Sequence, residues 1–163
     1  MIQRIQSLYL AGVLLCSLLL FFTAIASVEA PLHIYNFSIY GLFDVTSGVN
    51  QKLASTLPLL VLNGIVTLLT VVIIFQFKKR TLQIKLARLN ILLLVVFVVG
   101  TFFYFENASE QIFEIEKLST EKGLKVNYLL GAILPLIAII LNMLAARAIK
   151  KDDALVRSAD RIR

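Results

Sequence analysis

Four long apolar stretches constrain this chain more than any other feature. They lie at about residues 8–28, 57–77, 87–105 and 128–149. A helix needs about 20 apolar residues to cross roughly 30 Å of hydrocarbon, and in lipid each backbone amide must bond within its own segment. The chain is 59% hydrophobic, against about 45–50% in soluble domains. We therefore predict an all-α membrane protein, a four-transmembrane-helix bundle formed as one domain over residues 1–163, with a tail at 150–163.

The first stretch has a second interpretation, a cleavable signal peptide. Arg4 precedes it, and Ala24-Ile25-Ala26 is typical of a cleavage site. The apolar part, however, is longer than the roughly 7–15 residues of a signal core. We favour a retained span and keep cleavage as the alternative.

Lysine and arginine residues divide unevenly between the two sides of such a bundle. Twelve of the sixteen lie at the N-terminus, between the second and third stretches, or at the C-terminal end. Seven of the ten acidic residues lie in the other two loops. Basic residues in short loops stay in the cytoplasm. Both chain ends and the middle loop are therefore expected on the cytoplasmic side.

The first outer loop, residues 29–56, alternates apolar and polar residues. Tyr35, Phe37 and Ile39 stand two apart, and Gly41, Phe43 and Val45 continue the pattern. This period is typical of strands with one buried face. We expect one or two short strands here.

The second outer loop is more ambiguous. Phe113 and Ile115 alternate with Glu114 and Glu116, which favours a third strand. Alternatively, residues 107–109 cap a short helix over 111–118. We favour a small β-sheet formed by the two outer loops.

Small and polar residues line one face of the second and fourth stretches. In the fourth, the steps of three and four are typical of a helix face; the residues of both faces are Asn63, Thr67, Thr70, Gly131, Pro135, Ala138 and Asn142. Small residues let membrane helices approach closely. We predict that the two faces meet in the bundle interior, with Asn142 near the depth of Thr70 and Asn90 shallower. The alternative is a polar pathway, but ion-coupled transport usually leaves a buried ionisable residue in a span.

No motif of catalytic or cofactor chemistry stands out, and we expect no enzyme, cofactor, metal site or catalytic residue. The only histidine, His33, lacks a convincing set of companions for a metal or for general-base catalysis. Clustering of His33 with Asp44 and glutamates in an outer cleft would revive an enzyme hypothesis. The one cysteine, Cys16, lies within an apolar stretch and is expected to pack there.

The basic residues expected in the cytoplasm are candidates for contact with a partner or with lipid. They are Lys78, Lys79, Arg80, Arg88, Lys150, Lys151, Arg157 and Arg161. Anionic headgroups attract such residues by about 1 kcal/mol per charge. Contact with RNA, for example with a ribosome at the membrane, is a further possibility, although topology alone already accounts for the charges.

Three segments carry a resemblance to a known family. They are residues 1–6 (MIQRIQ) with 8–10 (LYL), residues 77–90 (FKKRTLQIKLARLN) and residues 149–163 (IKKDDALVRSADRIR). In these the chain resembles the bacterial membrane family named domain of unknown function 4293. The resemblance implies a bacterial inner membrane and supplies no activity. Its most recognisable motifs all lie on the expected cytoplasmic side.

The sequence favours a non-catalytic inner-membrane protein that acts as an accessory or structural subunit of a larger membrane complex. The absence of catalytic groups and the small-residue helix faces support this hypothesis. The alternative is a small transporter or channel that uses the polar faces. That alternative requires an interior cavity lined by Asn63, Thr67, Thr70 and Asn142.

Overall fold

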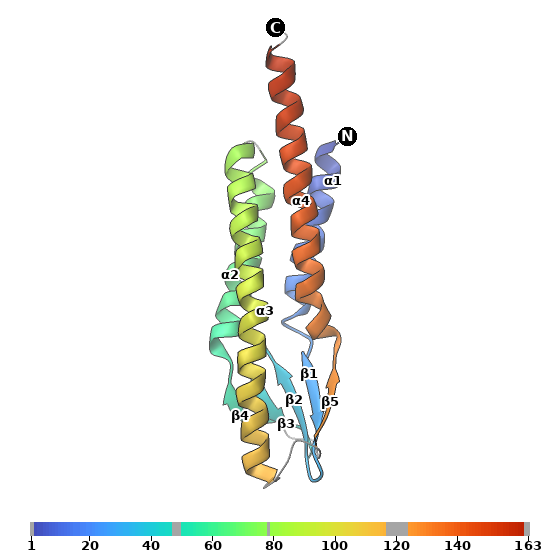
Figure 1. Ribbon diagram of the computed structural model, residues 1–163, viewed down its shortest axis with the longest axis vertical. Coiled ribbons are helices and arrows are strands. Elements are labelled where there is room, and N and C mark those ends of the chain that lie inside the picture. The colour runs from blue at the N-terminus through green and yellow to red at the C-terminus, as the bar shows by residue number, and fades with distance from the viewer. Residues whose placement is uncertain (1, 47–49, 78, 117–123, 162–163) are drawn as a thin grey trace.

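The computed structural model describes residues 2–46, 50–77, 79–116 and 124–161 (Figure 1). Side chains at 2–4 and 156–161 lie outside that description. Within these ranges the chain forms four helices and five strands. In order they are α1 (Ile2–Leu19), β1 (Ala26–Glu29), β2 (Ile34–Ser38), β3 (Gly41–Asp44), β4 (Gln51–Ser55), α2 (Leu57–Phe75), α3 (Arg80–Glu116), β5 (Lys125–Tyr128) and α4 (Leu130–Arg161).

The four helices run side by side, and the strands lie together beyond the ends of α1, α2 and α4, alongside the last part of α3 (Figure 1). Both chain termini lie at the opposite end, which we call the terminal end. The main helix contacts join α1 to α2 and α4, and α3 to α2 and α4. Helices α2 and α4 therefore occupy diagonal positions in the bundle.

Three helices are long and apolar enough to cross a membrane, by length and composition. They are Leu57–Phe75, Arg80–Glu116 and Leu130–Leu155. The apolar part of α1, Ile5–Leu19, is shorter. Helix α4 continues through Pro135 without a break and carries the tail to Arg161, so residues 150–161 extend the fourth helix.

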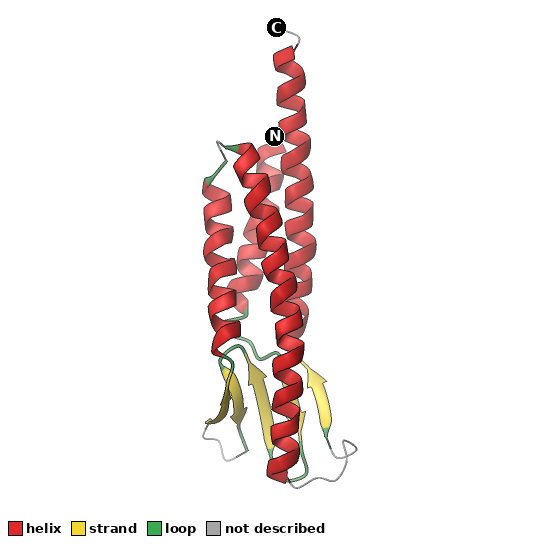
Figure 2. Ribbon diagram, turned by 60° about the vertical axis from the view of Figure 1, so that its left-hand side comes forward, coloured by secondary structure: helices red, strands yellow, loops and turns green. Residues whose placement is uncertain are grey.

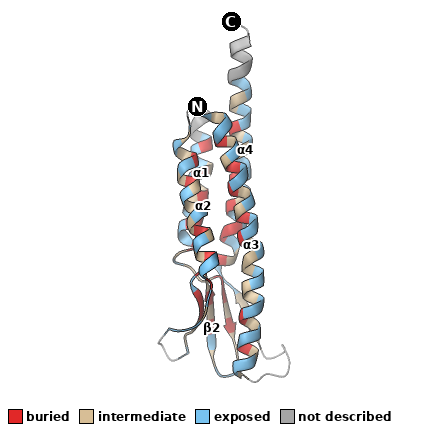
Figure 3. Cartoon of the chain, turned by 90° about the vertical axis from the view of Figure 1, so that its left-hand side faces the viewer, coloured by how far each residue is buried: buried red, intermediate tan, exposed pale blue. Residues whose placement is uncertain are grey.

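The strands form one antiparallel sheet in the order β4-β3-β2-β1-β5 (Figure 2). The prediction of a small sheet beside the helices is confirmed, and it contains more strands than expected. Its tightly buried side chains include Val28, Tyr35, Phe37 and Leu42. Figure 3 shows buried positions along β2 and on the inner sides of the helices.

The predicted span at 8–28 is wrong at its C-terminal end. Helix α1 ends at Leu19, and Ala26–Glu29 form β1, which pairs with both β2 and β5. Ala26 and Val28 are buried while Ser27 and Glu29 are not. This period of two fits a strand, whereas on a helix residues two apart point to nearly opposite faces and would not both face the core.

The predicted third strand at 113–116 is also wrong, because α3 continues without interruption to Glu116. Ala108 and Ile112 stand four residues apart and are both buried, as expected for one face of a helix. Ahead of them, the ring of Phe105 packs edge-on against Phe37 at 5.5 Å between centroids. We call the five strands with residues 106–116 of α3 the sheet layer.

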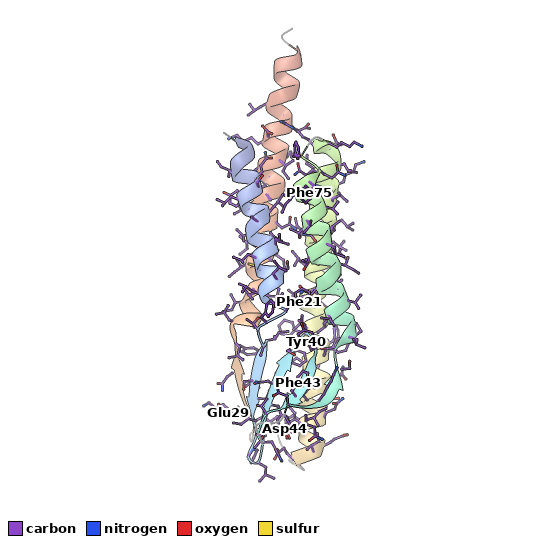
Figure 4. The ribbon with its side chains drawn as sticks, turned by 180° about the vertical axis from the view of Figure 1, so that it is seen from behind. Phe21, Glu29, Tyr40, Phe43, Asp44 and Phe75 are labelled. Atoms are coloured by element: carbon purple, nitrogen blue, oxygen red, sulfur yellow. The ribbon has the colours of Figure 1, made fainter. Side chains whose placement is uncertain are left out.

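One hydrophobic core runs from the helices into the sheet layer. It includes Val13 and Phe97 of the bundle together with Phe37 and Ile112. A second, smaller cluster lies toward the terminal end and consists of Leu10, Ile73, Ala87 and Ala145. Phe21 and Tyr40 stand where the helices meet the sheet (Figure 4).

Candidate functional site

A layer of three polar side chains lies deep in the helix bundle. Thr70, Asn90 and Asn142 come from α2, α3 and α4, and each is fully buried. Asn90 donates from Nδ2 to Thr70 Oγ1 at 3.0 Å, and Thr70 donates to the Val66 carbonyl at 2.7 Å. Within the described chain, Asn90 Oδ1 and both side-chain polar atoms of Asn142 have no partner.

The three residues of this polar layer share a depth in the bundle. Arg80 pairs with Asp152 at 2.8 Å and thereby fixes the level of α3 against antiparallel α4. Asn90 and Asn142 each lie ten positions from that ion pair, and equal numbers of residues give equal rise. On either side the layer is bordered by apolar core residues, for example Val66 on one side and Ile73 on the other.

This arrangement corrects two predictions about depth and pairing. Thr70 bonds to Asn90, and the predicted meeting of the two polar faces does not bring Thr70 into a bond with Asn142. The reason is that α2 and α4 lie diagonally opposite in the bundle. Thr70 of α2 therefore bonds to a residue of its neighbour α3. Asn90 is consequently as deep as Asn142 rather than shallower.

The remaining predicted residues of the second stretch bond within the bundle. Asn63 is buried and donates from Nδ2 to the Ser17 carbonyl of α1 at 3.1 Å. Thr67 donates to the Asn63 carbonyl of its own helix at 2.8 Å. Two polar residues that the sequence reasoning missed behave similarly. Gln6 donates to the Ala148 carbonyl at 3.2 Å, and Gln83 to the Ile73 carbonyl at 3.0 Å.

The small residues of α4 lie closer to the sheet layer. The amide of Gly131 donates to the Ala24 carbonyl at 3.2 Å, and Ala138 is buried in the main core. Gly131 and Pro135 also line an apolar cavity of about 310 Å³ between α3, α4 and the start of the sheet. Thr101 lines the same cavity, but its hydroxyl already donates to the Phe97 carbonyl at 2.8 Å. The cavity therefore offers mainly hydrocarbon.

A cluster of ionisable groups lies at the far end of the sheet layer. His33 Nδ1 is 2.9 Å from Glu116 Oε1, and His33 Nε2 is 3.9 Å from Asp44 Oδ2. The Tyr35 hydroxyl donates to the same Glu116 oxygen at 3.1 Å. The Glu116 side chain is only 1% exposed, whereas the imidazole of His33 is 40% exposed. Figure 4 shows Asp44 at this end of the molecule.

The environment shifts the pKa values of two groups in this cluster in opposite directions. Burial raises the pKa of the Tyr35 hydroxyl, and its hydrogen bond to Glu116 raises it further. Bonds from the Thr46 backbone and hydroxyl lower the pKa of Asp44, with a smaller contribution from His33. Tyr35 is thus held neutral and Asp44 charged, which stabilises the cluster near neutral pH.

Clustering of His33 with Asp44 and a glutamate meets part of the condition that would revive an enzyme hypothesis. The two imidazole nitrogens face different carboxylates, so the donors do not converge on one point. Across the described part of the chain, no group of three His, Cys, Asp or Glu residues is arranged to hold a metal ion. The apolar cavity does not touch the cluster, and neither does a second cavity at the terminal end. The geometry favours a structural role that fixes the end of α3 to the sheet.

At the terminal end, Arg80 donates from Nη1 to the Asp152 carboxylate at 2.8 Å and to the Asp152 carbonyl at 3.2 Å. The other predicted contact residues that can be described there are exposed: Lys79, Arg88, Lys150 and Lys151. Lys78 lies outside the described residues. Arg157 and Arg161 belong to α4 by their backbone, and their side chains are not described.

The chain belongs to the family described as Domain of unknown function (DUF4293), whose model matches residues 2–162. The match covers all four helices and the sheet, and it confirms the resemblance inferred from the terminal and middle-loop motifs. No curated protein matches the sequence.

Proposed function

We propose that the chain crosses a bacterial inner membrane four times, with both ends and the turn between α2 and α3 in the cytoplasm. The termini and this turn lie at one end of the bundle (Figure 1), where most Lys and Arg residues also lie. Positively charged short segments stay cytoplasmic. Large apolar side chains such as Leu68, Phe102 and Ile140 are exposed on the helices, which suits contact with lipid.

We assign helix α1 as the fourth span because it packs within the bundle and exposes apolar side chains. Its apolar part, Ile5–Leu19, measures about 22 Å at 1.5 Å per residue, and the apolar residues that follow up to Phe22 extend it toward the roughly 30 Å of the hydrocarbon core. It packs against both α2 and α4, and its exposed residues include Leu8 and Leu15. Labelling of single cysteines placed at Lys79 and Lys52 tests the orientation. Outside labelling is expected at residue 52 only, and labelling of residue 79 from outside would overturn it.

Within that membrane we propose a non-catalytic role as a subunit of a larger complex. The observation that carries the proposal is the projection of α4 well past the ends of the other helices (Figure 1). The base of this projection is anchored by the pairing of Arg80 with Asp152. It exposes Lys150, Lys151 and Leu155. A basic helix with an apolar residue that extends beyond its own bundle suits a protein partner in the cytoplasm.

Co-purification in mild detergent tests this role. A tagged full chain is expected to retain a partner in stoichiometric amount, and the double variant K150E/K151E is expected to lose it. The matched control is K52E, since Lys52 is an exposed lysine on β4 at the opposite end. Nuclease treatment separates a protein partner from RNA or a ribosome. Recovery of the chain alone in several detergents would contradict the proposal.

The alternative of a transporter or channel receives less support. It requires an interior cavity lined by Asn63, Thr67, Thr70 and Asn142, and none of them lines the apolar cavity or the cavity at the terminal end. Thr70 and Asn142 are fully buried. Reconstituted protein that moves a solute, with loss of that movement in Asn142→Leu, would favour the alternative.

A further inference from the structure

The cavity at the terminal end has a volume of about 310 Å³ and lies between α1, the end of α2 and the start of α3. Unlike the apolar cavity, it combines charged, polar and apolar side chains. A cation (Arg80), neutral polar groups (Gln6, Ser7 and Gln83) and an apolar group (Ile74, Phe75 and Phe77) line it. These correspond to the phosphate, the polar headgroup and the first acyl carbons of a phospholipid.

The cation of this cavity is held in place and still has donors to offer. Both bonds of Arg80 to Asp152 start at Nη1. A guanidinium has five N–H donors, so Nε and Nη2 can bind a phosphate oxygen while Nη1 stays on Asp152. Such charge-assisted bonds from arginine to phosphate are among the stronger hydrogen bonds. The guanidinium side chain is 25% exposed, so an anion can approach it.

The two amides form a rigid polar wall. Gln6 and Gln83 are 6% and 4% exposed, and each donates from Nε2 to a backbone carbonyl of a neighbouring helix. One of the two N–H donors of each amide is thereby occupied. The second N–H and the amide oxygen are groups that can bond a hydroxyl of a polar headgroup.

The apolar wall opens toward the surface. Phe75 and Phe77 are 74% and 51% exposed, and Figure 4 shows Phe75 near the terminal end of the bundle. A free phosphate ion has no part that would cover these rings. A phospholipid does, because its acyl chains begin a short distance from its phosphate.

The surrounding charge favours an anionic ligand. Lys79, Lys85 and Arg88 are exposed around the start of α3, and Lys150 and Lys151 on α4. The acidic residues of α4 at this end are Asp152, Asp153 and Asp160, and Asp152 is paired with Arg80. Each basic residue near an anionic leaflet contributes about 1 kcal/mol of attraction.

We propose that this cavity binds the headgroup of an anionic phospholipid of the cytoplasmic leaflet. The phosphate binds Arg80, the polar headgroup lies against Gln6 and Gln83, and the first acyl carbons cover Phe75. The choice of leaflet rests on the proposed orientation. The binding itself rests on neither the orientation nor a partner protein, so a test of binding can fail independently of both.

The experiment measures thermal unfolding of the purified full chain in detergent with a thiol-reactive dye. Cys16 is the one cysteine of the sequence and is buried, so it reacts on unfolding. A ligand that binds the folded state raises the unfolding midpoint. Dioleoylphosphatidylglycerol should raise it more than dioleoylphosphatidylcholine, which carries the same chains. Soluble glycerol phosphate should have little effect. Equal effects of the two lipids, or of glycerol phosphate and phosphatidylglycerol, would overturn the proposal.

Three variants locate the effect. Arg80→Gln should raise the phosphatidylglycerol concentration needed for half of the shift about fivefold, the equivalent of about 1 kcal/mol. Asp152→Asn breaks the same ion pair but keeps the cation, so it should bind at least as tightly as the natural chain. Lys85→Gln removes one exposed charge outside the cavity and should change the value less than about twofold. Undiminished binding in Arg80→Gln, or an equal loss in Asp152→Asn, would contradict the site.

Discussion

In the helix bundle the buried polar side chains are neutral and several of them bond to backbone carbonyls, whereas in the sheet layer ionisable side chains bond to one another, whether buried, like Glu116, or exposed, like Lys125. Gln6, Asn63 and Gln83 each donate to a carbonyl of a neighbouring helix. In the sheet layer, Glu116 meets His33 and Tyr35. Likewise Glu29 accepts a bond from Asn127 at 2.9 Å and lies 3.5 Å from Lys125.

The difference follows from what surrounds each region. The bundle exposes apolar residues nearly all round, and a charge among such helices would cost several kcal/mol. Neutral amides can bond a carbonyl without leaving a charge behind. The sheet layer has partly exposed groups such as His33 at its end, so solvent can support the charges of the cluster. The two regions of the chain therefore differ in how they bond their polar side chains.

The seam between the two regions should give the largest effect. A Cβ at Gly131 would stand 2.5 Å from the Ala24 carbonyl oxygen, and backbone cannot move aside cheaply. We expect Gly131→Ala to lower the free energy of unfolding by about 3 kcal/mol. The control is Gly64→Ala, where a Cβ meets nothing within 4 Å and the helix should gain about 0.5–1 kcal/mol. Thermal unfolding reported by Cys16 compares them, and equal effects would show that the close approach at Ala24 is unimportant.

Removal of the Glu116 carboxylate tests the sheet layer alone. Glu116→Ala leaves the buried Tyr35 hydroxyl without its acceptor, at a cost of about 1–3 kcal/mol. Hydrogen exchange of the β2 amides should accelerate, while exchange in the bundle should not. Glu114→Ala, an exposed position on the same helix, should stay within about 0.5 kcal/mol of the natural chain. Acceleration throughout the molecule would mean that the two regions unfold as one.

In the polar layer of the bundle, replacing one of the two asparagines should increase stability and replacing the other should decrease it. Asn142→Leu replaces an amide whose two polar atoms lack partners in the described chain with an apolar group of similar size. We expect a gain of about 1 kcal/mol. Asn90→Leu loses the bond to Thr70 and should cost about 0.6 kcal/mol. A loss of stability in Asn142→Leu would instead indicate that its amide binds water or another group in the membrane.

Alkaline pH should affect the sheet layer and spare the bundle. The pKa of Tyr35 is raised in the folded chain, so the unfolded chain loses this proton first. The stabilisation is complete below about pH 10, the ordinary pKa of tyrosine, and is lost as pH rises further. In Tyr35→Phe, exchange of the β2 amides should depend less on pH above 10. The same dependence in both proteins would assign it to other groups.

The local sequence pattern predicted the helices and the existence of the sheet, because long apolar runs and an alternation with a period of two can be recognised in consecutive residues. The local pattern misassigned residues 113–116, because their alternation fits a strand. The helical spacing of Ala108 and Ile112 becomes informative only when one knows that both face the sheet. The pattern also merged Ala26–Glu29 with the first span, since four residues give a weak signal. The pairing of His33 with Glu116 joins positions 83 residues apart, so no local sequence pattern could predict it. Likewise, the bond between Thr70 and Asn90 depends on which helices are neighbours in the bundle, and the sequence does not show this order.

Helix α3 gives the molecule a mechanical property. Its 37 unbroken residues measure about 56 Å, and they join the Arg80 contact with α4 at one end to the Glu116 cluster at the other. A rod of this length that pivots by about 10° at one end carries its far end through about 10 Å. A partner that binds or releases α4 at the terminal end could therefore move the sheet layer at the other end of the molecule.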